Sequence, residues 1–142
     1  MMISTKGRYA LRVMVDLAEH PTEAYIPLKE IAQRQEISEK YLESILKVLV
    51  RNGVLTGLRG KGGGYRLTKE PNQYTVGDIL EMMEELAPVS CLGKEAAKCP
   101  RMATCRTLPM WEKLDDMIHR FFHGITIADL AFSPQSGGDY VI

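Results

Sequence analysis

The stretch between residues 54 and 68 constrains the fold of this chain most, because two β-prone segments flank Arg59-Gly-Lys-Gly-Gly-Gly64 there. The four glycines between Arg59 and Tyr65 supply positive φ angles and close backbone approach, so the stretch predicts a β-hairpin with a glycine-rich tip. The cationic side chains Arg59, Lys61 and Arg66 lie on or beside this tip. A hairpin can turn on a single Asn-Gly pair, so this tip has more glycine and positive charge than the turn requires. The excess predicts a tip that approaches an anion. The DNA backbone is the obvious anion, and an arginine is attracted into a narrow minor groove; the alternative is a flexible, solvated loop.

Upstream of the hairpin, the pattern predicts two short helices joined by a turn. Pro27 fits the start of the first helix. Ser38 is a good N-cap for the second, and Ile37 and Leu42 stand at the positions of a hydrophobic staple. Asn52-Gly53 ends the second helix in the manner of a left-handed C-cap. Two helices followed by a basic hairpin predict a winged helix-turn-helix, in which the N-terminal turn of the second helix enters the major groove.

The first turn of that second helix presents polar side chains to the predicted groove. Glu39 fits best as a solvated side chain. Glu43 can accept a hydrogen bond from a cytosine amino group, so a carboxylate is compatible with base reading here. For Tyr41 and Glu43 the alternatives, a core tyrosine and a solvated glutamate, remain open. With the hairpin tip included, the candidate DNA-binding residues are Ser38, Lys40, Tyr41, Glu43, Arg59 and Lys61.

The zero net charge of the chain hides a division along its length. Residues 1–70 carry 12 Lys/Arg against 8 Asp/Glu, whereas residues 71–142 carry 6 against 10. Residues 38–69, which hold the second helix and the hairpin, carry 7 basic residues against 2 acidic ones. The middle of the chain is therefore electropositive, and a neutral overall balance does not argue against nucleic-acid binding.

The remaining periodicity predicts a mainly α-helical chain with the hairpin as its β element. An apolar stripe over residues 5–20 predicts a first helix, and Thr75 begins another that ends at Ala87-Pro88. The expected divisions are a winged helix-turn-helix DNA-binding domain over 1–70, a linking helix and cysteine loop over 71–106, a dimerisation helix and short terminal helix over 107–132, and a flexible tail over 133–142.

The apolar periodicity over residues 111–125 predicts a helix with a narrow apolar seam suited to a partner helix. Successive members of the seam are spaced 3, 4, 3 and 4 residues apart, as in a coiled coil. Met117 and Phe122 broaden the stripe, so burial against the chain's own N-terminal part is the alternative. Dimerisation is favoured because a winged helix alone buries little surface and because two-fold dimers normally read DNA half-sites. The seam consists of Trp111, Leu114, Ile118, Phe121 and Ile125.

Three cysteines, Cys91, Cys99 and Cys105, lie within fifteen residues of one polar loop between two predicted helices. This grouping points to a metal or an iron–sulfur cluster held by thiolates. Zinc sites usually carry a close Cys-x2-4-Cys pair that this loop lacks, whereas iron–sulfur clusters accept looser spacing. The alternatives are a thiol redox sensor and inert loop cysteines. Cations that would lower thiolate pKa values and offset cluster charge are Lys94, Lys98, Arg101 and Arg106.

The length of 142 residues fits one domain, or one small domain with an extension. The sequence has no run of 18 apolar residues and no signal-peptide h-region, so we expect neither a membrane span nor secretion. The odd cysteine count argues against a disulfide framework, and a reducing cytoplasm is the simplest location. We do not expect an enzyme, because Gly60-Lys61 is followed by glycine and is not a phosphate-binding P-loop.

Four stretches of the chain form a specific combination: Lys6-Gly-Arg-Tyr-Ala10, Ile37-Ser-x-x-Tyr-Leu-Glu43, Arg59-Gly-x-Gly-Gly-Gly-Tyr65, and the three-cysteine loop followed by Trp111. Together they resemble the IscR-type regulators of the Rrf2 family, which are small winged-helix repressors. The similarity covers residues 1–130. It implies a homodimer built on a long crossing helix over 107–123. It also implies that Ser38, Lys40, Tyr41 and Glu43 face the major groove, that Arg59 enters the minor groove, and that Cys91, Cys99 and Cys105 ligate an iron–sulfur cluster that tunes DNA affinity.

One ligand position departs from that pattern. IscR-type regulators have a histidine three residues after the third cysteine, and this chain has Leu108. Some relatives use an acidic residue near position 8 of the partner subunit, where this chain has Arg8. The fourth ligand is left to Glu95, a histidine or an exogenous molecule, although distance along the helix argues against His119 and His123 of the same subunit. A 2Fe–2S or 4Fe–4S cluster with such a ligand set would be labile and readily lost on purification.

The sequence therefore predicts a dimeric DNA-binding transcriptional regulator, of the repressor type, that senses cluster status and through it iron, oxygen or nitric oxide. The alternative is a cluster-free regulator that responds to thiol redox state or to a partner enzyme of cysteine metabolism. Cluster-free relatives generally lack this cysteine set, which counts against the alternative. The expected partners are a double-stranded DNA operator, a second copy of the chain, and a protein of cysteine metabolism or cluster assembly, with no membrane partner.

Overall fold

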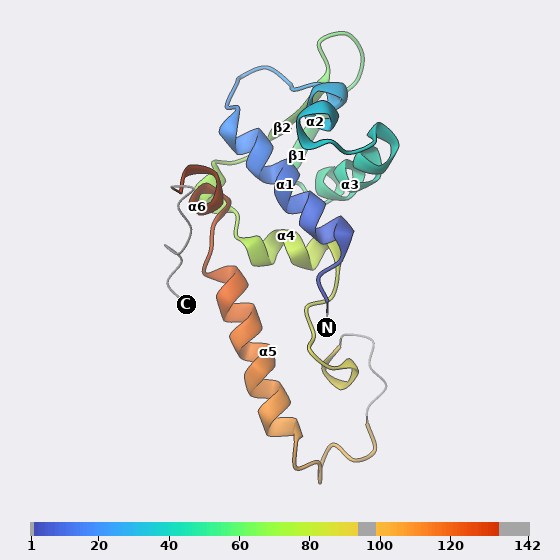
Figure 1. Cartoon of the computed structure of the whole chain (residues 1–142), viewed down its shortest axis with the longest axis vertical. Coiled ribbons are helices and arrows are strands. Elements are labelled where there is room, and N and C mark those ends of the chain that lie inside the picture. The colour runs from blue at the N-terminus through green and yellow to red at the C-terminus, as the bar shows by residue number, and fades with distance from the viewer. Residues whose placement is uncertain (1, 94–98, 134–142) are drawn as a thin grey trace.

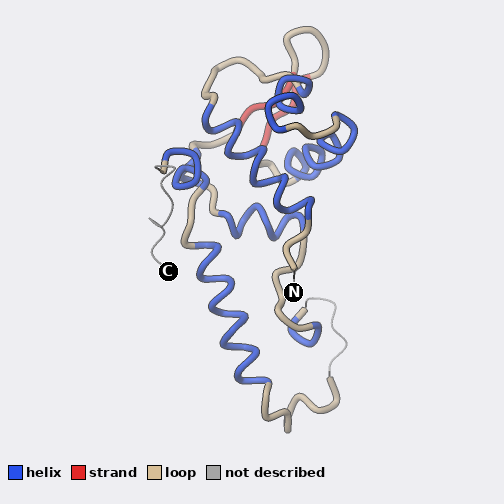
Figure 2. Tube along the Cα trace, in the orientation of Figure 1, coloured by secondary structure: helices blue, strands red, loops and turns tan. Residues whose placement is uncertain are grey.

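The computed structural model describes residues 2–93 and 99–133 and confirms a mainly α-helical chain with one antiparallel hairpin (Figures 1 and 2). Helices α1 to α3 and the hairpin β1–β2 gather at one end and are called the head. Helix α4 crosses below α1. The cysteine loop, which spans residues 89–107, lies far from the head, and α5 runs from it back toward the head (Figure 1). The elements are α1 (Thr5–Glu19), α2 (Leu28–Gln35), α3 (Glu39–Arg51), β1 (Leu55–Leu58), β2 (Gly64–Leu67), a 3-10 turn (Pro71–Gln73), α4 (Val76–Met83), a second 3-10 turn (Ser90–Leu92), α5 (Leu108–His123) and α6 (Ile127–Phe132).

The helix boundaries in the head follow the predicted capping chemistry. The Ser38 hydroxyl accepts a hydrogen bond at 3.2 Å from the backbone N–H three residues later. Thr75 and Asp78 form the reciprocal capping box that starts α4. Beyond the end of α3, Gly53 has a φ of 75°, the left-handed geometry that a glycine C-cap supplies. Short-range signals of this kind fix where α3 begins and ends and where α4 begins.

Helix α4 ends at Met83, earlier than the predicted stop at Ala87-Pro88. The next residue, Glu84, turns its carboxylate to the start of α1. It accepts hydrogen bonds from the backbone N–H of Ser4 at 3.0 Å and from the Ser4 hydroxyl at 2.5 Å. Gly7 lies under this carboxylate, where an added Cβ would overlap it. The end of α4 is thereby tied to the start of α1.

One apolar core closes the head, and the C-terminal helix α6 contributes to it. Ile127 is fully buried in this core, and its backbone N–H donates to the carbonyl of Tyr74 at 2.9 Å. The N–H of Val76 donates to the carbonyl of Ile125 at 2.8 Å. Residues 125–132 therefore return to the head after the long excursion of α5. Fully buried core members include Ala10, Val13, Met14, Ile31, Leu42, Ile45, Leu46, Leu49 and Ile79.

The hairpin gains a third backbone segment beside β2, near the end of the ladder that leads into the tip. Ile26 pairs with Tyr65 through two hydrogen bonds of 2.9 and 2.8 Å. Gly64 lies against this segment with a φ of 145°, and an added Cβ would overlap the carbonyl of Ile26. Part of the glycine content attributed above to close approach of an anion is therefore needed by the wing itself, which is defined as residues 55–67.

Helix α5 has no buried residue. Ile118 and Phe122 pack with Ile125 against a second small apolar cluster of the same chain. The seam predicted as one interface is thus divided, because part of it faces the chain's own α4 region. None of the described helices is both long and apolar enough to cross a membrane. The large apolar side chains of α5 that stay exposed are Met110, Leu114, Met117 and Phe121.

Candidate nucleic-acid interface and cysteine loop

The N-terminal turn of α3 is exposed and lies against α1. The side chains of Ser38, Lys40 and Glu43 are exposed. Tyr41 is 37% exposed, and its ring meets the ring of Tyr9 edge-on with centroids 5.8 Å apart. Tyr41 is therefore not a core residue, and its hydroxyl end can reach a ligand while Tyr9 steadies the ring.

Helix α1 supports this turn from behind. The Arg12 guanidinium lies 4.9 Å from the centre of the Tyr9 ring. The same guanidinium donates to the side-chain oxygen of Gln35 at 3.1 Å and to the Gln35 carbonyl at the end of α2. Glu36 follows with a φ of 55° and turns the chain toward α3. These contacts fix the orientation of α2 relative to α1 and so the position of the first turn of α3.

A hollow of about 680 Å³ lies between α3 and the wing. Lys47 and Arg51 of α3 line one side, and Arg59 of the wing lines the other. Glu43 also lines it and pairs with Lys47 at 3.7 Å. Cations on both walls can hold the phosphates of a strand that passes between the helix and the wing. Lys47 and Arg51 were missed as site residues, although successive steps of four from Glu43 to Lys47 and from Lys47 to Arg51 place them on one helix face.

Two of the three cations predicted at or beside the wing tip are exposed on it, and the third is not at the tip. Arg59 and Lys61 are exposed on it. Between them Gly60 has a φ of 89° with open space around it, so the tip is unobstructed. Arg66 is placed differently from the expectation, because it donates to the carbonyl of Glu23 at 2.7 Å and its guanidinium lies 4.7 Å from the centre of the Tyr25 ring. Arg66 braces the base of the wing.

The cysteine loop places its three thiols on separate local structures. Cys91 lies in a 3-10 turn, Cys99 starts a run of turns, and Cys105 precedes α5. All three are half-buried free thiols. A hydrogen bond with the Thr107 hydroxyl, at 3.4 Å, lowers the pKa of Cys105, with further help from backbone N–H groups and the charge of Arg101. A thiol that ionises readily is suited to binding a metal or cluster.

The donor set fits three of the four protein positions of an iron–sulfur cluster. Leu108 opens α5 and offers no donor atom. The candidate ligand Glu95 and the cations Lys94 and Lys98 lie outside the described residues. The described part of the chain contains one group of three potential ligand side chains with donor atoms within 4.8 Å, and the cysteines are not in it. In a 4Fe–4S cluster each ligand binds a different iron atom, so the ligand sulfurs are farther apart than the ligands of a single ion.

Comparison with known proteins gives a consistent result. A family model for Rrf2, described as an iron-dependent transcriptional regulator, matches residues 3–133. Protein rrf2 of Nitratidesulfovibrio vulgaris is 40% identical over 131 residues, which cover 92% of this chain and 87% of that protein. The HTH-type transcriptional regulator IscR of Serratia proteamaculans is 38% identical over 131 residues, with coverage of 92% and 79%.

Solved structures resemble the whole chain as well. CymR, the global cysteine regulator of B. subtilis, superposes with a TM-score of 0.76 and 34% identity, covering 95% of this chain and 99% of that one. IscR of T. potens gives a TM-score of 0.75 and 34% identity, with coverage of 99% and 94%.

Proposed function

The chain belongs to the Rrf2 family of transcriptional regulators, and on that premise we propose that it is a dimeric repressor whose operator affinity depends on a cluster in the cysteine loop. Members of this family are DNA-binding regulators, so the chain binds DNA and is not an enzyme, as the sequence predicted. The finer points are which residues contact DNA, how the dimer forms and what the regulator senses. Its site of action would be the cytoplasm.

The cationic hollow between α3 and the wing is the observation that carries the proposed mode of DNA binding. Ser38, Lys40, Tyr41 and Glu43 would read bases in the major groove, and Glu43 also lines the hollow. Arg59 would enter the adjacent minor groove, with Lys61 on the neighbouring phosphates. Support comes from the exposure of these side chains and from the cations on both walls of the hollow.

Replacing Arg59 with alanine is expected to lower operator affinity by on the order of tenfold and to reduce the slope of log affinity against log salt by about 1, because one cation leaves the interface. The measurement is fluorescence anisotropy at several salt concentrations, with a duplex enriched from a random pool by the unaltered chain. Lys113→Ala is the control, because it removes the same charge from the exposed surface of α5. Equal losses in the two variants would mean that Arg59 acts only through net charge.

The exposed stripe of α5 supports the proposed homodimer. An isolated helix of about this length is only marginally stable in water, and α5 packs on its own chain through only part of its apolar surface. Leu114 and Phe121 lie seven residues apart on the exposed side, and Met110 and Met117 complete the stripe at spacings of four and three. A second copy of α5 would cover this stripe and place two heads on the half-sites of one operator.

The cysteine loop supports a cluster held by Cys91, Cys99 and Cys105. A bound cluster supplies a redox- and iron-sensitive link between the three thiolates, and ordering of the loop at the end of α5 would change how the heads are held. The fourth ligand stays open, because Leu108 cannot coordinate. The carboxylate of Glu85 brings an oxygen donor to the loop, since an added Cβ at Gly93 would come within 2.9 Å of it.

Alanine at Cys91, Cys99 or Cys105 is expected to abolish the visible charge-transfer absorption of anaerobically reconstituted protein and to change operator affinity or operator choice. Iron and sulfide assays on the same samples provide the stoichiometry. Met102→Ala, in the same loop, is the control that should keep the colour. Unchanged operator binding in all three cysteine variants would remove the sensing role from the loop.

A cluster-free regulator is the second candidate, and two observations favour it. Leu108 replaces the expected histidine, and the global cysteine regulator CymR is among the structures that superpose on this chain. An unaltered chain that stays colourless after anaerobic reconstitution would support this candidate. The sensing role would then pass to the thiols or to a partner enzyme of cysteine metabolism.

A further inference from the structure

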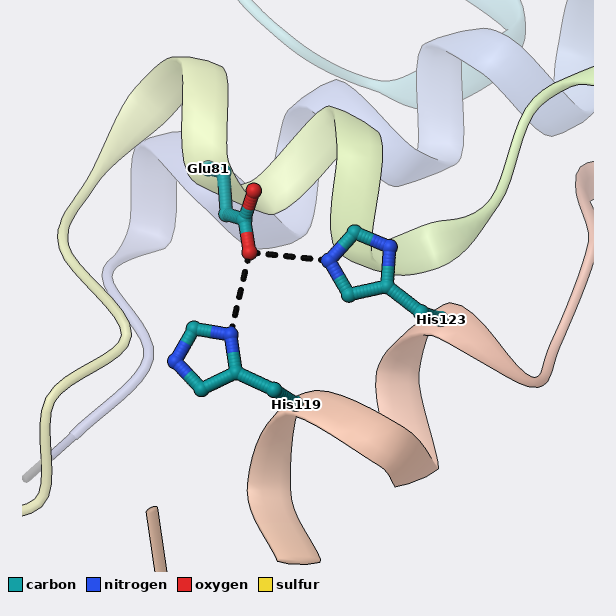
Figure 3. A group of neighbouring side chains, drawn as sticks. All are labelled: Glu81, His119 and His123. Carbon is teal, nitrogen blue, oxygen red and sulfur yellow. Dashed lines mark hydrogen bonds and ion pairs between the residues drawn. The ribbon is translucent and has the colours of Figure 1, made fainter. Parts of the chain in front are cut away.

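Three side chains of α4 and α5 converge away from the cysteine loop. Glu81 of α4 points between the imidazoles of His119 and His123 on α5 (Figure 3). Its Oε1 atom lies 3.1 Å from Nδ1 of His119 and 2.8 Å from Nε2 of His123. One ligand atom from each residue lies within 4.8 Å of the other two. Two nitrogens and one carboxylate oxygen are thus gathered around one point.

The helix geometry holds the two rings in place. A spacing of four residues puts His119 and His123 on one face of α5. The rings are nearly parallel, with an angle of 10° and centroids 6.3 Å apart. The ring of His123 rests on Gly77 of α4, where an added Cβ would come within 2.6 Å of it. A glycine in α4 therefore lets this imidazole approach the helix that carries Glu81.

The outward nitrogen of each ring also faces an oxygen. Nε2 of His119 lies 3.4 Å from a carboxylate oxygen of Asp115. Nδ1 of His123 lies 3.1 Å from the Thr75 hydroxyl and 3.6 Å from a carboxylate oxygen of Asp78. Histidines that bind metals almost always donate their second N–H to a carboxylate, carbonyl or water, which fixes the tautomer and the ring orientation. Both imidazoles have such an acceptor.

We propose that Glu81, His119 and His123 form a binding site for one divalent transition-metal ion, with Zn²⁺ the ion that fits the donor set. Two imidazoles and one carboxylate with a water in the fourth position are an established zinc ligand set. Donors bound to one zinc at about 2.0–2.1 Å lie roughly 3.3 Å apart in a tetrahedron. The two observed oxygen–nitrogen separations, 2.8 and 3.1 Å, are close to that value, and the two nitrogens lie within 4.8 Å of each other. Mg²⁺ and Ca²⁺ prefer all-oxygen sites and fit less well.

The surroundings allow an ion to enter. The side chains of Glu81 and His119 are each 37% exposed and that of His123 is 36% exposed. An open cavity of about 520 Å³ adjoins Glu81 and His119, so a water or an exogenous ligand has room beside them. Asp115 also lines this cavity and adds negative charge that attracts cations.

Because the site lies between α4 and α5, a bound ion would link these two helices. Helix α4 packs on α1 of the head, and α5 carries the stripe proposed above for dimerisation. An ion coordinated by Glu81, His119 and His123 would link the head to α5 by ligand bonds. This last step rests on the proposed function, whereas the metal site does not.

The test is a competition titration of the full chain with Zn²⁺ against a chromogenic chelator. To remove thiolate binding, it uses a background in which Cys91, Cys99 and Cys105 are alanine. We expect one equivalent of Zn²⁺ in this background. Glu81→Gln, His119→Gln and His123→Gln should each abolish that equivalent, and Asp115→Asn should weaken it by about 10–100-fold. His20→Gln is the matched control, because His20 follows α1 and lies outside the group.

Two further measurements keep the result independent of variant folding. Imidazole NMR of the same background should show Zn²⁺-induced shifts for His119 and His123 and none for His20. Co²⁺ should give visible d–d bands without sulfur-to-cobalt charge transfer. Anaerobic titration with Fe²⁺ distinguishes iron from zinc as the preferred ion, because two histidines and a carboxylate also bind non-haem iron.

Failure of Zn²⁺ and Fe²⁺ to bind the cysteine-free background would overturn the proposal. Binding that persists undiminished in both His119→Gln and His123→Gln would overturn it as well. In either case the three side chains would form a hydrogen-bonded ion-pair network and nothing more. Neither result involves DNA, so the assignment of the chain as a DNA-binding regulator would stand.

Discussion

Replacing Leu114 and Phe121 of α5 with glutamate is expected to make the chain monomeric and to lower operator affinity by on the order of 10²–10⁴-fold. Both side chains are exposed in the single chain, so the substitutions leave the head core untouched. In a dimer they would bring like charges together in an apolar contact, where desolvation is costly. Loss of the dimer removes the second head, and each half-site then binds alone. Analytical ultracentrifugation gives the mass, and anisotropy with the enriched duplex gives the affinity.

The matched control is Lys113→Glu with Arg120→Glu. This control places two carboxylates on α5 seven residues apart, as the test variant does. Each stands one residue before Leu114 or Phe121, on the polar side of the helix. Breaking the exposed pair of Arg120 with Asp116, at 2.9 Å, costs little. A control that stays dimeric beside a monomeric Leu114→Glu/Phe121→Glu variant would establish the stripe as the interface. A variant that remains dimeric at micromolar concentration would refute the proposed interface.

Removal of the Asp16 carboxylate is expected to lower the free energy of unfolding by about 2–4 kcal/mol at pH 7. Asp16 is a charged side chain of α1 with 2% of its surface exposed. Its carboxylate accepts hydrogen bonds from Arg34 at 2.6 and 2.9 Å and from Gln35 at 2.8 Å. Asp16→Ala leaves these α2 donors without their buried acceptor. Urea unfolding measures the loss, and Glu30→Ala, which removes only the exposed partner of Arg34, should cost at most about 1 kcal/mol.

The Asp16 contribution should also depend on pH. Burial raises the pKa of Asp16, but the hydrogen bonds and charge of Arg34, with Gln35 and the nearby His20, outweigh burial and hold the pKa below its ordinary value. The stabilisation is therefore complete above the unfolded pKa of about 3.9 and is lost as pH falls through the lower folded pKa. The stability gap between the unaltered chain and Asp16→Ala should narrow below about pH 4. A gap that stays constant down to pH 2 would contradict the assigned cause.

The head was predictable from sequence because its signals act over a few residues. Ser38 as an N-cap, the Thr75–Asp78 capping box and Gly53 as a C-cap each depend on atoms within one helical turn. The winged helix-turn-helix and the exposed candidate side chains of α3 and the wing followed from these signals. Which of those side chains contact DNA stays a prediction.

Features that depend on distant pairs could not be read from the sequence. Glu84 ends α4 against Ser4, which lies 80 residues earlier. Arg66 turns from the wing tip to the carbonyl of Glu23. The seam of α5 is divided because Ile118 packs on its own chain, a choice that periodicity alone cannot make. The spacing of four between His119 and His123 is visible in the sequence, but the position of Glu81 opposite them depends on how α4 packs on α5.

The burial of Ile127 in the head core has a consequence for how the protein is made. A chain that leaves the ribosome from its N-terminus exposes the apolar surfaces of α1 and α4 until residues 125–132 have emerged. The reading head therefore cannot be completed during synthesis of the cysteine loop or of α5. A product broken off by a premature stop within the loop would be an unfinished head with apolar surface open to proteases. We expect the cell to degrade it, so that a truncated chain with a complete head would not accumulate.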